Sequence, residues 1–338
     1  MSSRFFSNLK LTRTLVVTVF VLALAVMPLA VLAQIKIAFT TPADAERSGS
    51  YVWASTFAGE LQKAGLEVII YPSSTLGNEV VRTEQLLLGL LEVNITGSQE
   101  VEMFSDLYLG LELPFLFQST EELFALTDNT DFLARVNVTT QPSGMRVVDF
   151  TYGGGMTGLF TANTPVHRLE DLAELRLRAM NAQQLDFFLA WGSAGTQVAW
   201  EEVPQALQTG IADGYLNSPI IAVQFGHGGQ LDFFTRLMMQ ASTRTVVLSE
   251  QWYQGLDDDT QQTVDNAIKK ARKATQVWNA EAELTELQLL EDIGIEVITL
   301  STRERERFRE RLLPLYQTIP VQVLDEITQL VQQVREGQ

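Results

Sequence analysis

The sequence contains no cysteine. This absence excludes a disulfide framework, a thiolate metal site, a cysteine nucleophile and a lipidated N-terminal cysteine. Histidine is scarce too, since only His167 and His227 occur, and their separation matches no metal-ligand spacing. No residue pattern resembles a nucleophile elbow or a catalytic triad. We therefore expect no metal site, no cofactor and no catalytic residues.

Basic residues are few compared with acidic ones. The chain has 24 Lys and Arg against 41 Asp and Glu, for a formal net charge of −17. A chain this acidic repels phosphate backbones and anionic lipid surfaces, so we expect no nucleic-acid partner. An anionic small ligand would need a local cation to overcome the long-range field, which makes the positions of single arginines informative.

Long apolar runs are absent after the N-terminus. Residues 1–33 combine three basic residues, the apolar run "TLVVTVFVLALAVMPLAVLA" and small residues at Val31 and Ala33, and this pattern predicts a cleaved signal peptide and a periplasmic mature protein. A retained transmembrane anchor is the alternative, but Pro28 and the V-L-A exit favour cleavage. Removing this segment, which holds no acid, takes the formal net charge from −17 to −20. We expect the mature chain to be soluble and to meet a membrane only through a transporter.

The 338 residues suffice for two domains, and their pattern predicts an α/β fold. Strands alternate with helices after residue 34, which indicates largely parallel sheets. The first predicted elements are a strand at 35–39, a helix at 50–63, a strand at 66–72, a helix at 80–89 and a strand at 91–96.

A short pattern occurs twice. In "LLLGLLEVNI" and "LQTGIADGYL", a glycine (Gly89, Gly210) stands three residues after a leucine and three before an acid, as expected of a helix end followed by a strand. Each strand then leads into a polar loop, "TGSQE" at 96–100 and "YLNSP" at 215–219. Ligands bind beyond the carboxyl ends of strands in open α/β sheets, so the pattern suggests two similar lobes that face one cleft.

Two further segments concern the connection between these lobes. "GGGMTG" (153–158) satisfies G-x-G-x-x-G, but no helix follows it, so we interpret it as a flexible crossover between strands and not as a nucleotide site. A long helix is predicted from Asp257 or Asp258 to Gly294, and it could span both lobes. A capping box beginning at Ser301 predicts a further helix.

Arg178 is the most informative basic residue. The alternation in "LRLRAM" predicts a strand with Arg176, Arg178 and Met180 on one side, and Asn181 then begins a helix. An arginine at a strand's carboxyl end beside a helix N-terminus suits the bidentate binding of a carboxylate. The local pattern equally allows a surface ion pair with Glu170, Asp171 or Glu174.

In order and spacing, several segments resemble the periplasmic solute-binding proteins of TRAP transporters, DctP type. The resemblance covers essentially the whole mature chain and rests on "YPSSTLGNE", "LLLGLLEVNI", "ELPFLF", "LEDLAELRLRAM", "WGSAGTQVAWEEVPQALQTGIADGYLNSP" and "GIEVITLS". It implies a two-lobed periplasmic solute-binding fold with a hinge and a long helix spanning both lobes. The expected division is a first lobe of 34–155 and 243–282, and a second lobe of 156–242 and 283–338 that includes the C-terminal helices.

The resemblance also implies a ligand site. In the family an arginine pairs with the substrate carboxylate and an asparagine lines the site, and these match Arg178 and Asn217. Leu216 stands where the family usually has glutamate, and Gly158 stands where sialic acid binders carry a second arginine. The residues themselves add polar groups and aromatic walls to this site, although aromatic side chains at such spacing are often core. The expected ligand-binding residues are Arg178, Asn217, Tyr215, Gln99, Ser98, Tyr152, Met180, Asn181, Phe39 and Trp53.

The sequence therefore predicts a non-enzymatic periplasmic receptor that captures a small organic anion for TRAP membrane subunits. Two alternatives stay open at this point. One is a periplasmic enzyme that acts on a small acid, and the other is a receptor that presents its ligand to a sensor protein.

Overall fold

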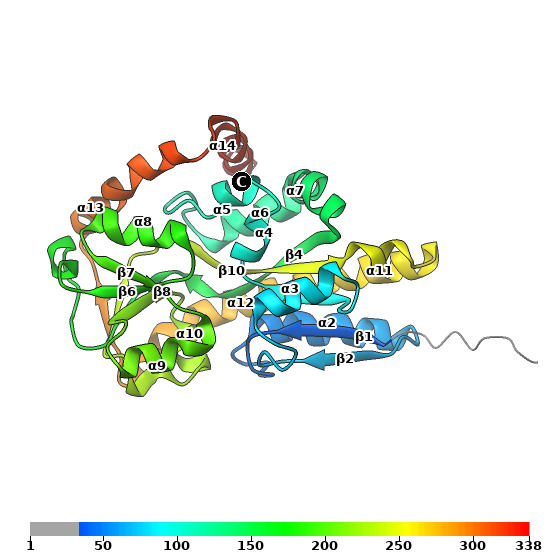
Figure 1. Cartoon of the computed structure of the whole chain (residues 1–338), viewed down its shortest axis with the longest axis horizontal. Helices are drawn as coiled ribbons and strands as arrows, with labels where there is room; N and C mark the ends of the chain where they lie inside the picture. Colours follow the sequence, from blue (N-terminus) through cyan, green and yellow to red (C-terminus); the bar gives the residue numbers. More distant parts are fainter. Residues whose placement is uncertain (1–33, 338) are drawn as a thin grey trace, which may run out of the picture. The chain divides into compact units, whose positions relative to one another are not determined.

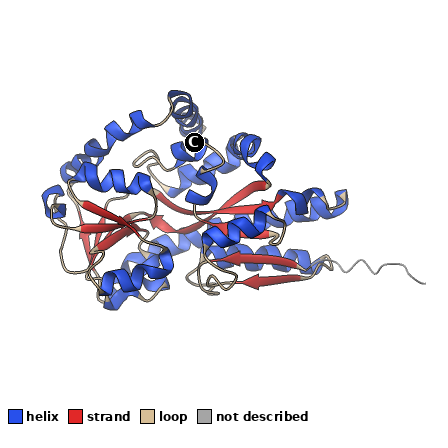
Figure 2. Cartoon of the chain, viewed as in Figure 1, coloured by secondary structure: helices blue, strands red, loops and turns tan. Residues whose placement is uncertain are grey.

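The computed structural model describes residues 34–337, so the predicted signal segment 1–33 lies outside the described residues. Two β-sheets organise this part of the chain, and they form two groups of strands with helices around each (Figures 1 and 2). The strand order is β2-β1-β3-β10-β4 in the five-stranded sheet and β11-β9-β5-β8-β6-β7 in the six-stranded sheet. We call each sheet with the helices packed on it the first and the second lobe. Within 34–337 no helix is both long enough and apolar enough to cross a membrane.

The first lobe contains the longest strands of the described chain. Its strands are β1 (Ile35–Phe39), β2 (Val68–Tyr71), β3 (Val93–Thr96), β4 (Met145–Met156) and β10 (Ala241–Ser249). Its helices are α2 (Gly49–Lys63), α3 (Glu79–Leu87), α4 (Gln99–Glu102), α5 (Leu107–Leu111), α6 (Thr120–Asn129), α7 (Phe132–Thr140) and α11 (Glu250–Gln254).

The second lobe is built from shorter strands. Its strands are β5 (Gly158–Thr161), β6 (Arg176–Ala179), β7 (Ala194–Gln197), β8 (Gly214–Asn217), β9 (Phe233–Arg236) and β11 (Glu296–Thr299). Its helices are α8 (Ala182–Trp191), α9 (Val203–Gln208), α10 (Ile220–Gln224) and α13 (Thr302–Leu312). Two more helices are α12 (Asp258–Asp292), which joins the lobes, and α14 (Val321–Glu336), which follows the second lobe in sequence.

Both sheets are mixed, which differs from the largely parallel sheets that the sequence suggested. β1 pairs in parallel with β2 and β3, but β10 runs antiparallel to both β3 and β4. In the second lobe β5 is antiparallel to β8 and β9, whereas β6 is parallel to β7 and β8. The antiparallel strands β5 and β10 are the first strands after the chain crosses from one lobe to the other. Their direction therefore depends on long-range connectivity, which the local alternation of residues does not indicate.

Alternation along each strand builds two apolar clusters per lobe. In β1, Ile35, Ile37 and Phe39 face a cluster with α2 and α12, while Ala38 faces the opposite cluster. In β5, Leu159 and Phe160 likewise enter different clusters. Helices therefore cover both faces of each sheet, and the strand ends are left to form the cleft between the lobes.

The helix α12 joins the lobes. Asp257 caps its start by accepting a hydrogen bond from the Thr260 N–H at 2.8 Å, and Gly294 follows its end with φ of 89°, as the sequence predicted. It packs on α2 and β4 of the first lobe and contacts α10 and β11 of the second lobe. Figure 1 shows it running behind both groups of strands.

The three glycines at 153–155 form the end of β4 and are held from two sides. The Gly154 N–H donates to Asn279 Oδ1 at 3.1 Å, and the Gly155 N–H donates to Glu286 Oε2 at 3.0 Å, both acceptors lying on α12. The Ser218 hydroxyl donates to the Gly153 carbonyl oxygen. The predicted flexible crossover is therefore a strand end whose backbone groups are bonded, and we call these contacts the glycine clamp.

The C-terminal helices differ from the expected division between lobes. α13 packs on α8 in the second lobe, but α14 packs on α5 and α6 in the first lobe. Its apolar face, Ile327, Leu330, Val331 and Val334, joins the same cluster as Leu111. The spacing of these four residues is that of one helix face, which explains why α14 needs an apolar partner surface.

Candidate ligand site

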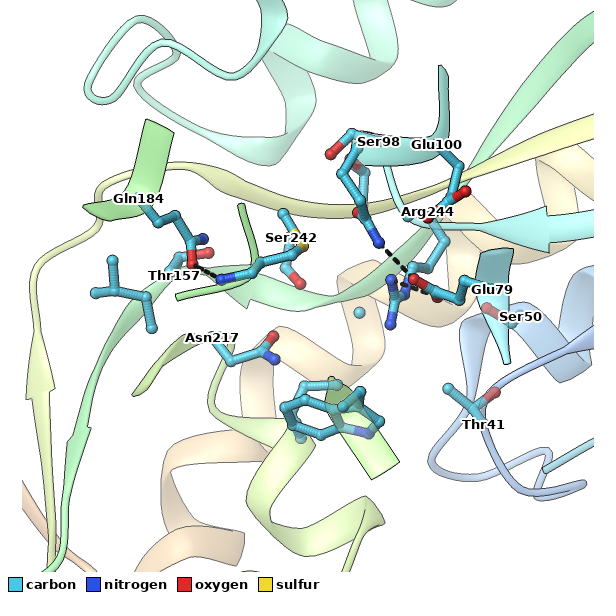
Figure 3. Close-up of a pocket in the computed structure, with 18 of the residues that line it drawn as sticks. Thr41, Ser50, Glu79, Ser98, Glu100, Thr157, Gln184, Asn217, Ser242 and Arg244 are labelled. Carbon is cyan, nitrogen blue, oxygen red and sulfur yellow. Dashed lines mark hydrogen bonds and ion pairs between the residues drawn. The ribbon is translucent and has the colours of Figure 1, made fainter. Parts of the chain in front are cut away.

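A cavity of about 320 Å³ lies between the strand ends of the two lobes. The start of α3, the loop into α4 and the strands β4 and β10 supply its first-lobe wall, and β6, β8, α8 and the turn at Trp200 supply its second-lobe wall. Figure 3 shows polar side chains from both sides pointing into it. Hydrogen bonds link the lobes at its rim, from Ser74 Oγ to Glu201 Oε1 at 3.0 Å and from Gln224 Nε2 to the Arg47 carbonyl oxygen at 2.7 Å.

Arg178 is the main cation of the second-lobe wall. It ends β6 with 7% of its surface exposed, its Nε donates to the Val198 carbonyl oxygen at 2.9 Å, and its guanidinium carbon lies 5.5 Å from the centre of the Trp200 ring. Burial, with the nearby charge of Arg244, lowers its pKa to about 10. Within residues 34–337 it forms no ion pair, and the charges of Glu79 and Glu201 act on it only from a distance, so this buried charge has no direct carboxylate partner.

The alternative that Arg178 pairs with local acids is not what the structure contains. Glu170 pairs with Arg307 on α13, and Asp171 pairs with Arg168 at 3.0 Å. Arg176 is the exposed arginine of β6, whereas Arg178 lines the cavity. The two arginines therefore have different surroundings despite their period-two spacing.

Asn217 and Gln184 are amides with one end already bonded. The Asn217 Oδ1 accepts from the Ser218 N–H at 2.9 Å, and the Gln184 Oε1 accepts from the Met180 N–H at 2.8 Å. Each thus turns its NH₂ group toward the cavity, as the labelled side chains in Figure 3 indicate. Met180 lines the cavity, while Asn181 caps α8 and contacts Glu102 across the cleft at 3.4 Å without lining it.

The first-lobe wall contains Ser98 and Gln99, two of the predicted site residues, together with the acids Glu79, Glu100 and Glu112. Gln99 Nε2 donates to Glu79 at 2.5 Å, and this leaves its buried Oε1 without a partner in the described chain. Glu100 and Glu112 also line the cavity. Burial raises the pKa of Glu112 to about 7 despite a hydrogen bond from Ser98, and burial with the charge of Glu79 raises that of Glu100.

A second arginine, Arg244 on β10, reaches the same cavity from the first lobe. Its Nη1 lies 3.0 Å from Glu79 Oε1, and Glu79 also accepts from Thr40. Burial alone would raise the pKa of Glu79, but Arg244 and Arg82 hold it below its usual range. Figure 3 shows this ion pair at the cavity wall. Arg244 is therefore neutralised by the protein itself, unlike Arg178.

Three predicted aromatic residues do not line the cavity. Phe39 and Trp53 are fully buried in the cluster between the first sheet, α2 and α12. Tyr215 is buried in the cluster with Phe160 and Phe234, where its hydroxyl bonds His227 Nδ1 at 2.9 Å. Tyr215 and Asn217 share one side of β8 by their period-two spacing, but Tyr215 lies inside the strand under this core, whereas Asn217 ends the strand at the cavity. Tyr152 does line the cavity, with its ring edge-on to Phe124.

The sequence analysis missed Glu79, Gln184, Trp200, Glu112 and Arg244, all of which line the cavity. Two of them had a usable signal. Glu79 ends the segment "YPSSTLGNE" directly before the helix predicted at 80–89, and Gln184 lies three residues after the predicted helix start at Asn181. The others come from segments far from any predicted strand end, so only the folded chain brings them to the site.

Comparison with known proteins identifies a family that matches most of the chain. The family model of the bacterial extracellular solute-binding proteins, family 7 (DctP), matches residues 45–322. Among curated proteins, the uncharacterized protein YiiZ of Salmonella typhimurium is 26% identical over 81% of this chain and 84% of its own. The sialic acid-binding periplasmic protein SiaP of Vibrio cholerae is 28% identical over 76% of this chain and 79% of its own.

Solved structures share the fold. A TRAP periplasmic solute-binding protein of Shewanella oneidensis with bound succinate superimposes with a TM-score of 0.82 at 21% identity, covering 89% of this chain and 98% of that one. A TRAP periplasmic solute-binding protein of Polaromonas bound to D-erythronate gives a TM-score of 0.81 at 23% identity, covering 88% and 98%.

Proposed function

The chain belongs to the bacterial extracellular solute-binding proteins of family 7, the DctP family, and we propose that it is a periplasmic receptor for a small organic acid. It captures the acid between its lobes and delivers it to the membrane subunits of a TRAP transporter. The pattern of residues 1–33 supports export.

This proposal rests on Arg178, a buried charge that has no direct carboxylate partner in the described residues. A buried guanidinium without a carboxylate partner is costly to the empty protein, and a ligand carboxylate would supply that partner. Its terminal nitrogens would bind the carboxylate in a bidentate manner, and the Asn217 amide would donate a further hydrogen bond. Organic acids bound to proteins of the same fold, succinate and D-erythronate, agree with this chemistry.

Gly158 supports a ligand other than a sialic acid. A Cβ at this position would lie 2.4 Å from Phe234 Cζ and 2.5 Å from the Thr235 carbonyl oxygen. No side chain fits there without displacement of β9, so a second arginine at this position is not compatible with the packing.

Closure of the lobes would complete the site. We propose that they move about the glycine clamp, the strand start near Ser242 and α12, with the boundaries 34–155 and 243–282 for the first lobe and 156–242 and 283–312 for the second lobe. Closure excludes water and strengthens the ion pair to Arg178.

The test is binding of organic acids to the chain without residues 1–33. A ligand at a hundred times its dissociation constant should raise stability by about 2.7 kcal/mol. Arg178→Ala should weaken carboxylate binding roughly 100-fold, since it removes charge-assisted hydrogen bonds. Arg176→Ala is the matched control because Arg176 lies exposed on the same strand, and it should leave affinity unchanged.

Unchanged carboxylate affinity in Arg178→Ala would overturn the site. Chemical turnover of a bound acid would favour the enzyme alternative. Uptake by vesicles that carry TRAP membrane subunits, dependent on this protein, separates delivery to a transporter from presentation to a sensor.

A further inference from the structure

The two walls of the cavity differ in hydrogen-bond polarity. On the second-lobe wall the groups left for a ligand are donors: the terminal nitrogens of Arg178 and the NH₂ groups of Asn217 and Gln184. In both amides the oxygen is already bonded to a backbone N–H. This wall therefore matches an acceptor, and a carboxylate is the strongest acceptor that a small metabolite carries.

On the first-lobe wall the same accounting gives one donor amide, Asn78, whose Oδ1 accepts from the Val81 N–H, and a group of four residues that offer acceptors. Gln99 gives its NH₂ group to Glu79 and keeps a buried, unbonded Oε1. Ser98 directs its hydroxyl hydrogen to Glu112, which leaves the oxygen lone pairs. The carboxyl groups of Glu100 and Glu112 complete this wall, which we call the acceptor wall: Ser98, Gln99, Glu100 and Glu112.

Arg244 is the one cation on the first-lobe side among the residues that line the cavity. Its charge is matched by Glu79 at 3.0 Å, and Glu79 is fixed by Gln99 and Thr40. A second ligand carboxylate would have to share Arg244 with Glu79, which already holds its Nη1, and would meet the carboxyl groups of Glu79, Glu100 and Glu112 at the same time. Like charges brought together in such a site cost several kcal/mol.

We propose that the ligand carries a single carboxylate and a tail rich in hydrogen-bond donors, and that the acceptor wall excludes dicarboxylates. This inference rests on the proposed function, since Arg178 orients the carboxylate toward the second lobe. The tail donors are hydroxyl groups, as in a sugar acid, or an ammonium group. Both satisfy the acceptors that would otherwise be buried without partners on closure.

The state of Glu112 agrees with this polarity. Its pKa is raised by burial and by the charge of Glu102, and the charge of Arg244 lowers it only in part. Above pH 7 Glu112 is mainly ionised, and another anion beside it would raise its pKa further at a cost in free energy. A hydroxyl donor brings no charge, and an ammonium group would favour the ionised form.

The experiment is calorimetric titration with four-carbon acids that share one carboxylate and differ in the tail. The set is D-erythronate (hydroxyls), 4-aminobutyrate (ammonium), butyrate (no tail donor) and succinate (second carboxylate), at pH 8. We expect a donor-bearing acid to bind at least about tenfold more tightly than butyrate or succinate. The better of the first two compounds identifies the donor.

Glu112→Gln is the informative variant, because it keeps the shape of the side chain and removes the charge. The variant should bind the preferred acid at most about tenfold more weakly and should bind succinate more tightly. The ratio of the two dissociation constants should therefore fall by roughly tenfold. Glu310→Gln on α13 is the matched control, since Glu310 is exposed and distant from the cavity, and it should leave the preference unchanged.

The outcomes separate this inference from the proposed function. If succinate binds as tightly as the best donor-bearing acid, or if Glu112→Gln leaves their ratio unchanged, the acceptor wall does not select the tail and the inference fails while the receptor stands. If no acid binds, the proposed function fails with it.

Discussion

Arg178 illustrates how the surroundings of a single residue decide its role. Its guanidinium is buried beside Trp200 and bonded through Nε alone, so its remaining nitrogens point at the cavity. Arg82 is also buried, but its guanidinium donates hydrogen bonds to Asn94 at 3.1 Å and to Thr40 at 2.9 Å, so these nitrogens already have protein partners. A structural arginine and a binding arginine therefore differ in how many of their N–H donors remain without a protein partner after folding.

Glu286 gives a prediction at the same scale. Burial raises its pKa to about 7, its neighbour Glu283 adds to this, and the N–H of Gly155 and the charge of Arg236 act in the other direction. The folded protein therefore holds this proton more tightly than the unfolded chain between about pH 4.5 and pH 7. Stability from this group is present at low pH and is lost as the pH rises through 7.

In Glu286→Gln this loss should disappear, so that the change in unfolding free energy between pH 5 and pH 8 shrinks by up to about 3 kcal/mol. Urea unfolding at both pH values measures it. Glu281→Gln, on the exposed side of α12, is the control and should behave as the original protein. An unaltered pH profile in Glu286→Gln would mean that the carboxyl is ionised throughout.

Sequence reasoning at this scale found Arg178, Asn217, Ser98, Gln99, Met180 and Tyr152 on the cavity wall, because each follows or ends a predicted strand. It could not assign donor and acceptor ends. Gln99 is one of the predicted ligand-binding residues, but its NH₂ group donates to Glu79, a residue twenty positions earlier in the chain. Such pairings depend on which strand ends meet in space.

At the scale of elements, the helix ends were the most predictable feature. Ser48, Asn78, Asn181 and Ser301 each cap a helix with a side-chain oxygen, and Gly210 follows α9 with φ of 68°. These signals are local, since a cap and its N–H are three residues apart. The direction of β5 and β10 was not predictable, because it follows from passages between lobes.

The glycine clamp gives a prediction for one element contact. Gly154 has φ of 87°, and a Cβ there would lie 2.4 Å from Glu286 Oε2. Gly154→Ala should therefore lower the unfolding free energy by at least about 1 kcal/mol, through backbone strain and the displaced carboxylate.

Gly59→Ala is the matched control for this change. Gly59 lies inside α2 with no atom within 4 Å of its added Cβ, so alanine should stabilise the helix by about 0.5 to 1 kcal/mol. Chemical denaturation of both variants gives the comparison. Equal effects of the two substitutions would show that the contact with Glu286 is not fixed.

At the scale of the whole molecule, α14 packs a C-terminal segment on the first lobe. Arg335 bonds Glu122 across 213 residues of sequence at 2.9 Å, and Leu330 lies fully inside the first-lobe core. Leu330→Ala should lower the unfolding free energy by about 2 to 5 kcal/mol. Gln332→Ala, an exposed position two residues further along α14, should have little effect when both variants are unfolded in urea. A small effect at Leu330 would indicate that α14 is not part of the core.

The position of α14 has a consequence for how the chain acquires its structure. The first lobe cannot cover the apolar face at α5 and α6 until α14, a sixteen-residue helix late in the sequence, packs against it. The second lobe, whose strands lie between residues 158 and 299 and whose helix α13 ends at Leu312, has all of these elements before α14 begins. The first lobe therefore begins earlier in the sequence but is completed later than the second lobe. Until α14 packs on it, the first lobe exposes apolar surface.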